Sequence, residues 1–324
     1  MKNVHTIFRA LLFCTLALAF VSATQAQSNH TWVTGAGGDD GGPCSRTSPC
    51  STFSGAYSKT ATNGEINCLT PGGYGAVTIT KSITINCHDV FGGASHSSSQ
   101  GVLINFDSFS GTDTTKSVRL RNISYQGVDT GTRAIRILGG ANSAGSKVSV
   151  ENCVIDGNFG TPGRGIEDTR SGGGSLLVTN TTIRNLGGTA ISHASPNGSA
   201  RIDIALDNVR IFNCLYGVAV RDGGNMVITN SVIASCESAG LYAEAILAAS
   251  TLHANNVALN NNGIGIQQAS SGANIRIGNS DITNSTTNGT SGTVNSYGNN
   301  RVAGNAGTTT LTPVGPDSHD KGQQ

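Results

Sequence analysis

The sequence contains a short phrase of alternating apolar and polar residues that ends in asparagine and occurs seven times. Another apolar residue stands three positions after each asparagine. The phrases end at Asn122, Asn152, Asn180, Asn208, Asn230, Asn256 and Asn279. Alternation with a period of two places neighbouring side chains on opposite faces of a β-strand. Because the phrase returns every 22 to 30 residues and no helical period accompanies it, the pattern predicts a solenoid built from turns of β-structure.

A second strand is predicted in most coils, where a small residue opens a further alternating run. These runs occupy residues 134–137, 165–168, 190–193, 217–220, 240–243 and 263–266. Strands that recur in every coil pair in parallel with their copies above and below, at a spacing of about 4.8 Å. We therefore expect an all-β fold of roughly nine or ten stacked coils, which form a rod about 45 Å long at that spacing.

The recurring asparagine is interpreted as a corner of the coil and not as a binding residue. Asn tolerates left-handed backbone conformations, and stacked amides bond to each other along a column. The composition agrees, since Gly supplies 44 of the 324 residues, about twice the usual share. Charged residues make up 12% and the net charge is +1, which gives no electrostatic basis for binding nucleic acid or an anionic membrane.

The first 26 residues have the layout of a secretory signal peptide. Lys2 and Arg9 precede an apolar run over residues 10–21, and small residues lead to a cleavage position after Ala26. The apolar run is too short to span a membrane. We therefore expect a secreted or periplasmic protein without a transmembrane segment, whose oligomeric state the sequence leaves open.

The two ends of the predicted solenoid differ from its middle. Residues 52–61 are typical of a short amphipathic helix with Phe53, Ala56 and Tyr57 toward the first coil, which would cover an open edge. After residue 306 the apolar pattern stops. The expected organisation is a β-helix domain over residues 27–306, with an N-terminal cap at 27–65, followed by a flexible tail over residues 307–324.

Seven cysteines remain once the signal peptide is removed, as expected for an oxidising compartment. Cys214 and Cys236 each lie six residues after a repeat asparagine, so they should stack in adjacent coils within disulfide reach. Two earlier pairs are expected, Cys44–Cys50 and Cys68–Cys87, and Cys153 is left unpaired. No cysteine spacing typical of zinc or redox motifs occurs, and no metal site is predicted.

The beginning of the mature chain and its repeats resemble a known superfamily. The matching features are residues 32–34, Asp39-Asp40, Pro43-Cys44, Pro49-Cys50, Thr52-Phe53, the Gly-Gly-Tyr-Gly at 72–75, the alternating run at 77–85 and the later Asn-x-x-Ile and Gly-Ile-x-Ile repeats. They are similar to bacterial right-handed parallel β-helix proteins of the pectin-lyase-like superfamily over residues 32–305. The resemblance implies a right-handed solenoid, in a superfamily of pectate lyases, polygalacturonases, alginate epimerases and phage tailspikes.

The catalytic signatures of this superfamily are not found in the sequence. Polygalacturonases carry Asn-Thr-Asp, Asp-Asp, Gly-His-Gly and Arg-Ile-Lys motifs, and the Asp39-Asp40 pair lies in the predicted cap, away from any catalytic position. Pectate lyases hold calcium with several carboxylates beside an arginine base, whereas the carboxylates here are scattered. No cofactor is therefore expected, and calcium is considered only for a lyase.

Polar side chains line one outer face of the predicted second strands. The outward position holds Arg136, Glu167, Ser192, Ala219, Tyr242 and Gly265 in successive coils, and two positions further on stand Leu138, Thr169, Ala194, Arg221, Glu244 and Gln267. We expect one patch of Arg136, Glu167 and Arg170. We expect a second patch of Arg221, Asp222 and Glu244. An arginine would pair with a uronate carboxylate, and an acidic residue would exchange protons.

The alternative for this face is a ladder of solvated ion pairs that contributes little energy. The candidate binding residues are Arg136, Arg221, Asp222, Tyr242 and Glu244.

Asp168 and His193 depart from an apolar column. The column holds Ile137, Val220, Ala243 and Ile266 in other coils. Both side chains are therefore predicted to point inward. Buried polar groups must satisfy each other or the local backbone, unless a bulge turns them outward. The candidate catalytic residues are Glu167, Asp168, His193 and Arg170.

Two classes of function fit the sequence. The missing signatures and the low charge density favour a non-catalytic binding or surface-structural module for extracellular polysaccharide or a cell-surface partner. The alternative is a lyase, epimerase or hydrolase acting on an acidic glycan. A groove over Glu167, Asp168 and His193 favours the enzyme, whereas a flat face favours binding or support.

Overall fold

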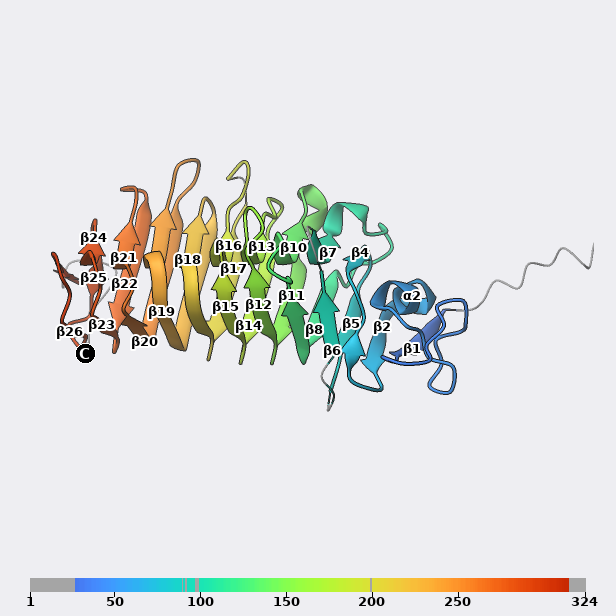
Figure 1. Ribbon diagram of the computed structural model, residues 1–324. Coiled ribbons are helices and arrows are strands. Elements are labelled where there is room, and N and C mark those ends of the chain that lie inside the picture. Colours follow the sequence, from blue (N-terminus) through green and yellow to red (C-terminus); the bar gives the residue numbers. More distant parts are fainter. Residues whose placement is uncertain (1–26, 89, 91, 97–98, 199, 315–324) are drawn as a thin grey trace, which may run out of the picture.

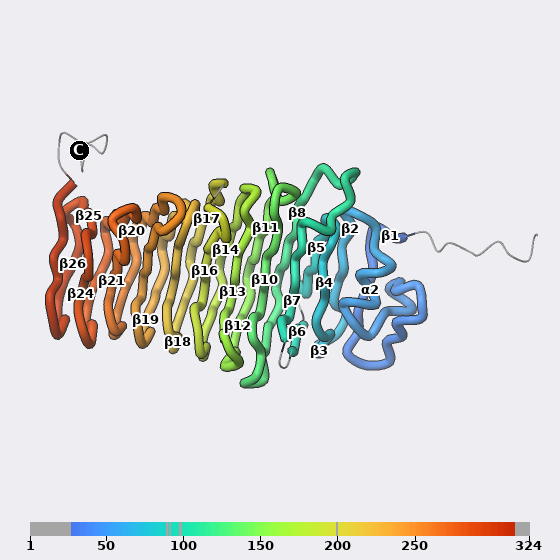
Figure 2. Tube along the Cα trace, turned by 90° about the horizontal axis from the view of Figure 1, so that it is seen from above, coloured from blue at the N-terminus to red at the C-terminus, as the bar shows by residue number. Residues whose placement is uncertain are grey.

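The computed structural model describes residues 27–314 apart from 89, 91, 97–98 and 199. The predicted signal peptide and residues 315–324 of the predicted tail lie outside the described residues. The chain winds into a rod whose N-terminal and C-terminal ends lie far apart (Figures 1 and 2). All strand pairs between coils are parallel, so the fold is the parallel β-helix that the sequence predicts.

Three columns of strands run along the rod. The first column contains β1 (Ser28–Val33), β2 (Thr60–Cys68), β5 (Ile83–Asn86), β8 (Ser117–Arg121), β11 (Ser146–Glu151), β14 (Gly174–Thr179), β17 (Ile202–Asp207), β19 (Gly224–Glu244), β20 (Ser250–Asn260), β22 (Ala273–Gly278), β25 (Asn295–Ser296) and β27 (Thr312–Pro313). The long strands β19 and β20 bend at their asparagines and continue into the second column. The first column therefore passes from the N-terminal end of the rod to its C-terminal end.

The second and third columns are shorter. The second contains β3 (Gly72–Gly73), β6 (Gly92–Ser95), β9 (Ile123–Gln126), β12 (Val154–Asn158), β15 (Thr182–Leu186), β18 (Arg210–Arg221), β19, β20, β23 (Asp281–Thr283) and β26 (Arg301–Ala303). The third contains β4 (Val77–Ile79), β7 (Gln100–Asn105), β10 (Arg133–Leu138), β13 (Arg164–Asp168), β16 (Thr189–His193), β18, β19, β21 (Ile264–Gln268) and β24 (Asn288–Ser291). Coils complete in all three columns run from β2–β3–β4 to β22–β23–β24, which confirms the expected number.

The seven repeat asparagines form the corner between the first and second columns. All seven have left-handed backbone conformations, with φ between 50° and 58°. Their amides also bond along the column: Asn208 donates to Asn180, and Asn256 donates to Asn230, each at 2.8 Å. The interpretation of the asparagine as a corner is therefore confirmed.

A second corner, which the sequence analysis did not predict, lies five residues further on. Asn185, Asn213, Ser235, Asn261 and Asn284 also have positive φ, between 53° and 58°. Asn213 donates to Asn185 at 3.2 Å. Each coil is thus bent twice by residues that accept the left-handed conformation at low cost.

The interior of the rod is apolar. Ladders of inward residues, one from each coil, fill it: Val118, Val148, Leu176, Ile204, Met226, Leu252 and Ile275 form one ladder of buried side chains. Burial of one such side chain contributes roughly 1.5–3 kcal/mol. Because every coil repeats the contribution, the solenoid is a stiff scaffold for its outer faces.

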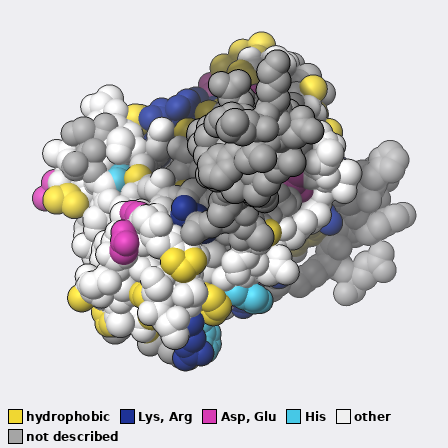
Figure 3. Space-filling view, turned by 90° about the vertical axis from the view of Figure 1, so that its right-hand side faces the viewer, with side chains coloured by type: hydrophobic (Ala, Val, Ile, Leu, Met, Phe, Trp, Pro, Cys, Tyr) yellow, Lys and Arg dark blue, Asp and Glu magenta, His cyan; other side chains and the backbone are white. Residues whose placement is uncertain are grey.

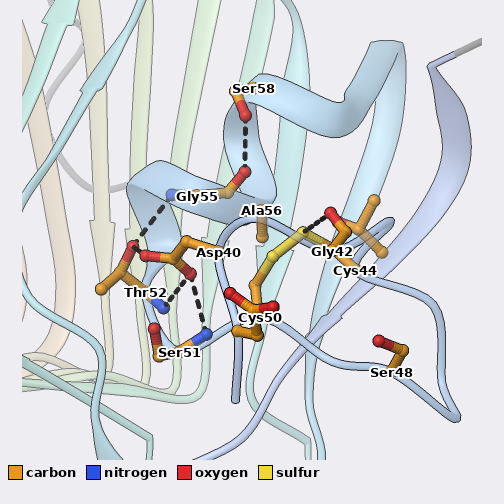
Figure 4. Close-up of a disulfide and its surroundings, with 12 residues drawn as sticks. Asp40, Gly42, Cys44, Ser48, Cys50, Ser51, Thr52, Gly55, Ala56 and Ser58 are labelled. Carbon is orange, nitrogen blue, oxygen red and sulfur yellow. Dashed lines mark hydrogen bonds between the residues drawn. A yellow bond between two sulfur atoms is a disulfide. The ribbon is translucent and has the colours of Figure 1, made fainter. Parts of the chain in front are cut away.

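The N-terminal end is covered by α2 (Phe53–Lys59), close to the predicted helix. Thr52 caps α2 by accepting a hydrogen bond from the Gly55 amide at 2.9 Å, and Asp40 in turn accepts hydrogen bonds from Ser51 and Thr52 (Figure 4). Burial raises the pKa of Asp40, but these bonds outweigh it and hold the pKa below its usual value. Asp40 is therefore part of the cap.

No helix in the part of the chain that the structure describes is long and apolar enough to cross a membrane.

The N-terminal end face of the rod carries both charged and neutral side chains on its visible part. Figure 3 views the N-terminal end, where charged side chains are scattered among neutral ones on the surface that undescribed residues leave uncovered.

The C-terminal end reaches further than expected. The predicted tail begins at residue 307, yet the Thr310 amide donates to the Thr290 hydroxyl and the Thr312 amide donates to the Val294 carbonyl, each at 2.8 Å. Hydrogen bonds to the backbone and to polar side chains of the preceding coil extend the last coil here, which an apolar periodicity cannot reveal.

The three predicted disulfides are present. Cys44–Cys50, Cys68–Cys87 and Cys214–Cys236 have Cα–Cα distances of 4.8, 4.6 and 4.6 Å, within the range that the bond requires. Cys153 is free and buried, and burial raises the pKa of its thiol to about 12.

Candidate functional site

A groove of about 370 Å³ lies on the outer face of the third column. Strands β13, β16, β18 and β19 form its floor, and the turns at 159–164 and 187–189 border one side. Four successive coils contribute to it, so the groove runs along the rod axis for about 14 Å at the usual strand spacing. The face over the candidate residues is therefore hollowed and not flat.

The register of the floor agrees with the predicted alignment except at its C-terminal end. Arg136, Glu167, Ser192, Ala219 and Tyr242 are register partners in successive coils. The partner of Tyr242 is Gln267 and not Gly265, so the predicted alignment of that coil is wrong by two residues. Small and apolar residues alternate throughout residues 263–266, so a shift of two leaves the pattern unchanged.

Glu167 lies among three arginines at one end of the groove. Its carboxylate accepts hydrogen bonds from Arg133 and Arg164 and faces Arg136 Nε at 3.1 Å. The Glu167 side chain is 4% exposed, whereas those of Arg133, Arg136 and Arg164 are 20%, 33% and 35% exposed. We call these three residues the arginine cluster. Three guanidinium groups facing one carboxylate leave an excess of two positive charges.

Arg133 and Arg164 were missed by the sequence analysis. They are register partners that open β10 and β13. Residues 133–136 and 164–167 both begin with arginine and carry a charged residue three positions later. Alignment of complete strands would have placed both arginines beside Glu167.

Arg170 lies away from the groove, so its predicted place in a patch with Arg136 and Glu167 is wrong. It is completely buried with Asp168: the Arg170 Nη2–Asp168 Oδ2 distance is 2.6 Å and the Arg170 Nε–Asp168 Oδ1 distance is 3.0 Å. Arg170 also donates to the Ser146 hydroxyl at 2.7 Å. The inward carboxylate needs a counter-charge, which draws the arginine inside.

His193 is the register partner of Asp168 in the next coil, and it too is completely buried. Both therefore point inward, as predicted. Neither ring nitrogen of His193 has a partner of hydrogen-bonding geometry among the described residues. Burial lowers the pKa of His193; the Asp168 carboxylate opposes this shift and the Arg170 charge adds to it. The imidazole is thus held neutral beneath the groove floor.

Aromatic side chains form the other end of the groove. The ring centroids of Tyr216 and Tyr242 are 5.2 Å apart in an edge-to-face arrangement, and the Arg221 guanidinium lies 5.1 Å from the Tyr242 centroid. Arg221 Nε is 3.0 Å from Glu244 Oε2. We call Tyr216 and Tyr242 the aromatic end. Burial raises the pKa of Tyr242, so its hydroxyl stays protonated.

Asp222 does not join Arg221 and Glu244 in the predicted second patch. One Asp222 oxygen accepts hydrogen bonds from the backbone amides of Ile246 and Leu247, each at 2.7 Å, and from the amide of Ala248 at 3.3 Å. Asp222 therefore holds the loop after β19 and has a structural role. Adjacent sequence positions at a strand end diverge because the chain turns there.

The described residues contain no group of three or more His, Cys, Asp or Glu side chains placed to hold a metal ion. The groove itself is lined by charged side chains and aromatic rings. Glu167 is neutralised by the arginine cluster, and Asp168 is neutralised by Arg170.

Comparison with known proteins agrees with the architecture. A family model described as "Right handed beta helix region" matches residues 133–306. A GH136 lacto-N-biosidase from Eubacterium ramulus has a similar structure, with a TM-score of 0.53 and 9% identity over 88% of this chain and 67% of that chain. The pectate lyase Pel9A superposes with a TM-score of 0.47 and 12% identity over 89% of this chain and 80% of that chain. At 9% identity the likeness to the lacto-N-biosidase shows the fold alone. No curated protein matches the sequence.

Proposed function

The chain belongs to the right-handed β-helix family, and on that premise we propose that its groove binds an acidic segment of an extracellular polysaccharide without cleaving it. The main observation in support is the arginine cluster, whose side chains remain partly exposed at one end of the groove while Glu167 is buried among them. An excess of positive charge in a groove attracts a carboxylate or sulfate and supplies charge-assisted hydrogen bonds.

The shape of the groove supports a chain-like ligand. The arginine cluster lies on β10 and β13 and the aromatic end on β18 and β19, so their members are two to four coils apart, which is about 10 to 19 Å at the usual strand spacing. A ligand that reaches from Arg133 to Tyr242 would therefore be longer than a single sugar ring. Tyr216 and Tyr242 offer an apolar surface for the carbon-bound hydrogens of a neutral ring, so the ligand would place an acidic unit and a less polar unit in a fixed order.

The state of the acid and base candidates supports binding over catalysis. General acid–base catalysis requires a group within hydrogen-bond reach of the reacting proton. Asp168 and His193 are completely buried beneath the floor, and Glu167 is engaged by two hydrogen bonds and an ion pair. Glu167 and Asp168 are thus already paired, and the unpaired ring nitrogens of His193 are not exposed in the groove.

The disulfides support the expected location outside the cytoplasm. Three pairs form within one chain, and such bonds persist mainly in oxidising compartments. Extracellular polysaccharide or another cell-surface component is therefore the partner that the protein would meet.

A retention assay on immobilised polysaccharides tests this function. Mature protein is applied to polygalacturonate, alginate and uncharged dextran at low and at high salt. We expect retention on the two acidic polymers at low salt, release at high salt because the contacts are ionic, and no retention on dextran. Equal behaviour on dextran and the acidic polymers would refute an acidic ligand.

Catalysis on the same glycan is the second candidate, and the groove above Asp168 and His193 favours it. The base would be His193, whose neutral imidazole lacks a fixed hydrogen-bond partner. It would take the carbon-bound proton next to the uronate carboxylate, and the electron pair left behind would form the C=C bond of an unsaturated uronate as the bond to the leaving sugar oxygen breaks. The imidazolium would then give the proton to that oxygen. Ultraviolet absorbance of polygalacturonate mixtures, with and without calcium, measures that product. We expect none, and its appearance in wild type but not in His193→Val would establish the lyase.

A further inference from the structure

The Cys214–Cys236 disulfide adjoins the aromatic end of the groove. The two cysteines are register partners on β18 and β19, with a Cα–Cα distance of 4.6 Å, and both are buried. The next residues along β18, Leu215 and Tyr216, line the groove. One peptide unit therefore separates the bond from the groove wall.

The strand pairing is irregular at this point. Cys214 pairs with Cys236, but Tyr216 pairs with Ala239. From the first pair to the second, β19 uses one residue more than β18, which is the signature of a bulge. A bulge leaves a residue unpaired and changes the direction of the following side chains. The backbone hydrogen bonds at the bulge therefore fix the position of Tyr216 less firmly than regular strand pairing would.

The surroundings leave little room for an alternative path of the chain. A β-carbon on Gly217 would lie 2.4 Å from Ile233 Cγ2, 2.5 Å from the Gly240 carbonyl oxygen and 3.4 Å from Cys236 Sγ. The disulfide thus lies in a tightly packed turn directly behind the groove wall.

Tyr216 connects this turn to the rest of the aromatic end. Its ring packs edge-to-face against the Tyr242 ring at a centroid distance of 5.2 Å, and the Arg221 guanidinium lies over the Tyr242 ring at 5.1 Å from its centroid. A shift of Tyr216 would remove the support of Tyr242 and, through it, that of Arg221.

We propose that the Cys214–Cys236 disulfide is a positioning element of the ligand groove, which fixes the bulged turn so that Tyr216 and Tyr242 keep the arrangement that the ligand meets. This inference rests on the proposed function for its effect on binding. The other two disulfides serve the N-terminal cap and the first coils, because Cys44, Cys50, Cys68 and Cys87 all precede the strands of the groove.

The test compares two disulfide deletions in the mature protein. Cys214→Val/Cys236→Val removes the bond next to the groove and fills its space with residues that suit strands, and Cys44→Val/Cys50→Val is the matched control in the cap. Nuclear magnetic resonance spectra of tyrosine-labelled protein report tyrosine packing without any ligand and without a signal from the disulfide itself, and calorimetric titration with oligogalacturonate reports affinity. Thermal melts followed in the far ultraviolet identify a temperature at which every variant is folded.

We expect the 214/236 variant to change the tyrosine signal and to weaken binding roughly fivefold, the size of an aromatic pair contribution. The control should keep the wild-type signal and affinity. A 214/236 variant with wild-type tyrosine signal and affinity would overturn the proposal. If wild type binds none of the acidic glycans, the proposed function fails, and the tyrosine signal alone still decides whether the disulfide positions the rings. Should the valine pair fail to fold, Cys214→Ser/Cys236→Ser is measured against the same criteria.

Discussion

Asp168 and His193 are register partners on adjacent coils, and both side chains are completely buried beneath the floor of the groove. In the two coils that follow, the same position holds Val220 and Ala243. The solenoid therefore encloses a charged pair, Asp168 and Arg170, and a neutral imidazole at positions that are apolar in the following coils. We therefore interpret Asp168, Arg170 and His193 as structural residues, and this interpretation predicts how substitutions of Asp168 and His193 change stability.

Asp168→Asn should destabilise the fold strongly. The substitution leaves Arg170 charged and without its counter-ion in the interior, which costs about 3–5 kcal/mol in comparable buried pairs. Urea unfolding of the variant and of wild type measures the difference. The matched control is Asp203→Asn, because Asp203 pairs with Arg201 at 2.6 Å on the surface and should lose less than about 1 kcal/mol. Equal losses in the two variants would contradict the buried pair.

His193 should make the fold less stable in acid. Burial lowers the pKa of His193 in the folded state, whereas an unfolded histidine has a pKa of about 6.5. The unfolded chain therefore binds the proton first as the pH falls, and stability present above pH 6.5 or so is lost below it. The low pKa of Asp168, which Arg170 holds down against the effect of burial, acts in the same direction at lower pH.

His193→Val tests this assignment, since valine occupies the equivalent position in the next coil. The free energy of unfolding is measured near pH 7.5 and near pH 5, on either side of the histidine range. We expect a smaller difference between the two pH values in the variant than in wild type. An unchanged difference would show that another group carries the acid sensitivity.

Asn208 should stabilise its corner through both its conformation and its amide. Its φ is 51°, and its amide donates to Asn180 at 2.8 Å. Asn208→Ala loses both contributions and should cost about 1–2 kcal/mol, whereas Asn208→Gly keeps the left-handed conformation and should cost less. Thermal or urea unfolding distinguishes the two. A glycine variant that is no more stable than the alanine variant would indicate that φ contributes little.

The fold was predictable because it repeats. The period of two within strands, the asparagine at the corner and the cysteines six residues after it all recur at one place in the coil, so register follows from sequence. Cys214 and Cys236 were paired on this basis, and the structure confirms them.

The site was predictable only in part, because it breaks the repeat. Glu167 was placed beside Arg136 correctly, but the direction of Arg170 depends on a turn after β13 that no repeat describes. Arg133 and Arg164 were missed because they open their strands, outside the short runs that were aligned. Gly265 was misplaced because the pattern of its coil is unchanged by a shift of two residues.

The central claim is that the arginine cluster binds the acidic group of a saccharide, and calorimetric titration of oligogalacturonate into Arg164→Gln tests it most directly. Arg164 lines the groove, whereas Arg301, which pairs with Asp281 at the C-terminal end, supplies the matched control Arg301→Gln. One charge-assisted hydrogen bond is worth roughly 1.5–3 kcal/mol, so we predict a loss of affinity of about tenfold or more in Arg164→Gln and none in Arg301→Gln. Equal affinity in wild type and Arg164→Gln would contradict the account.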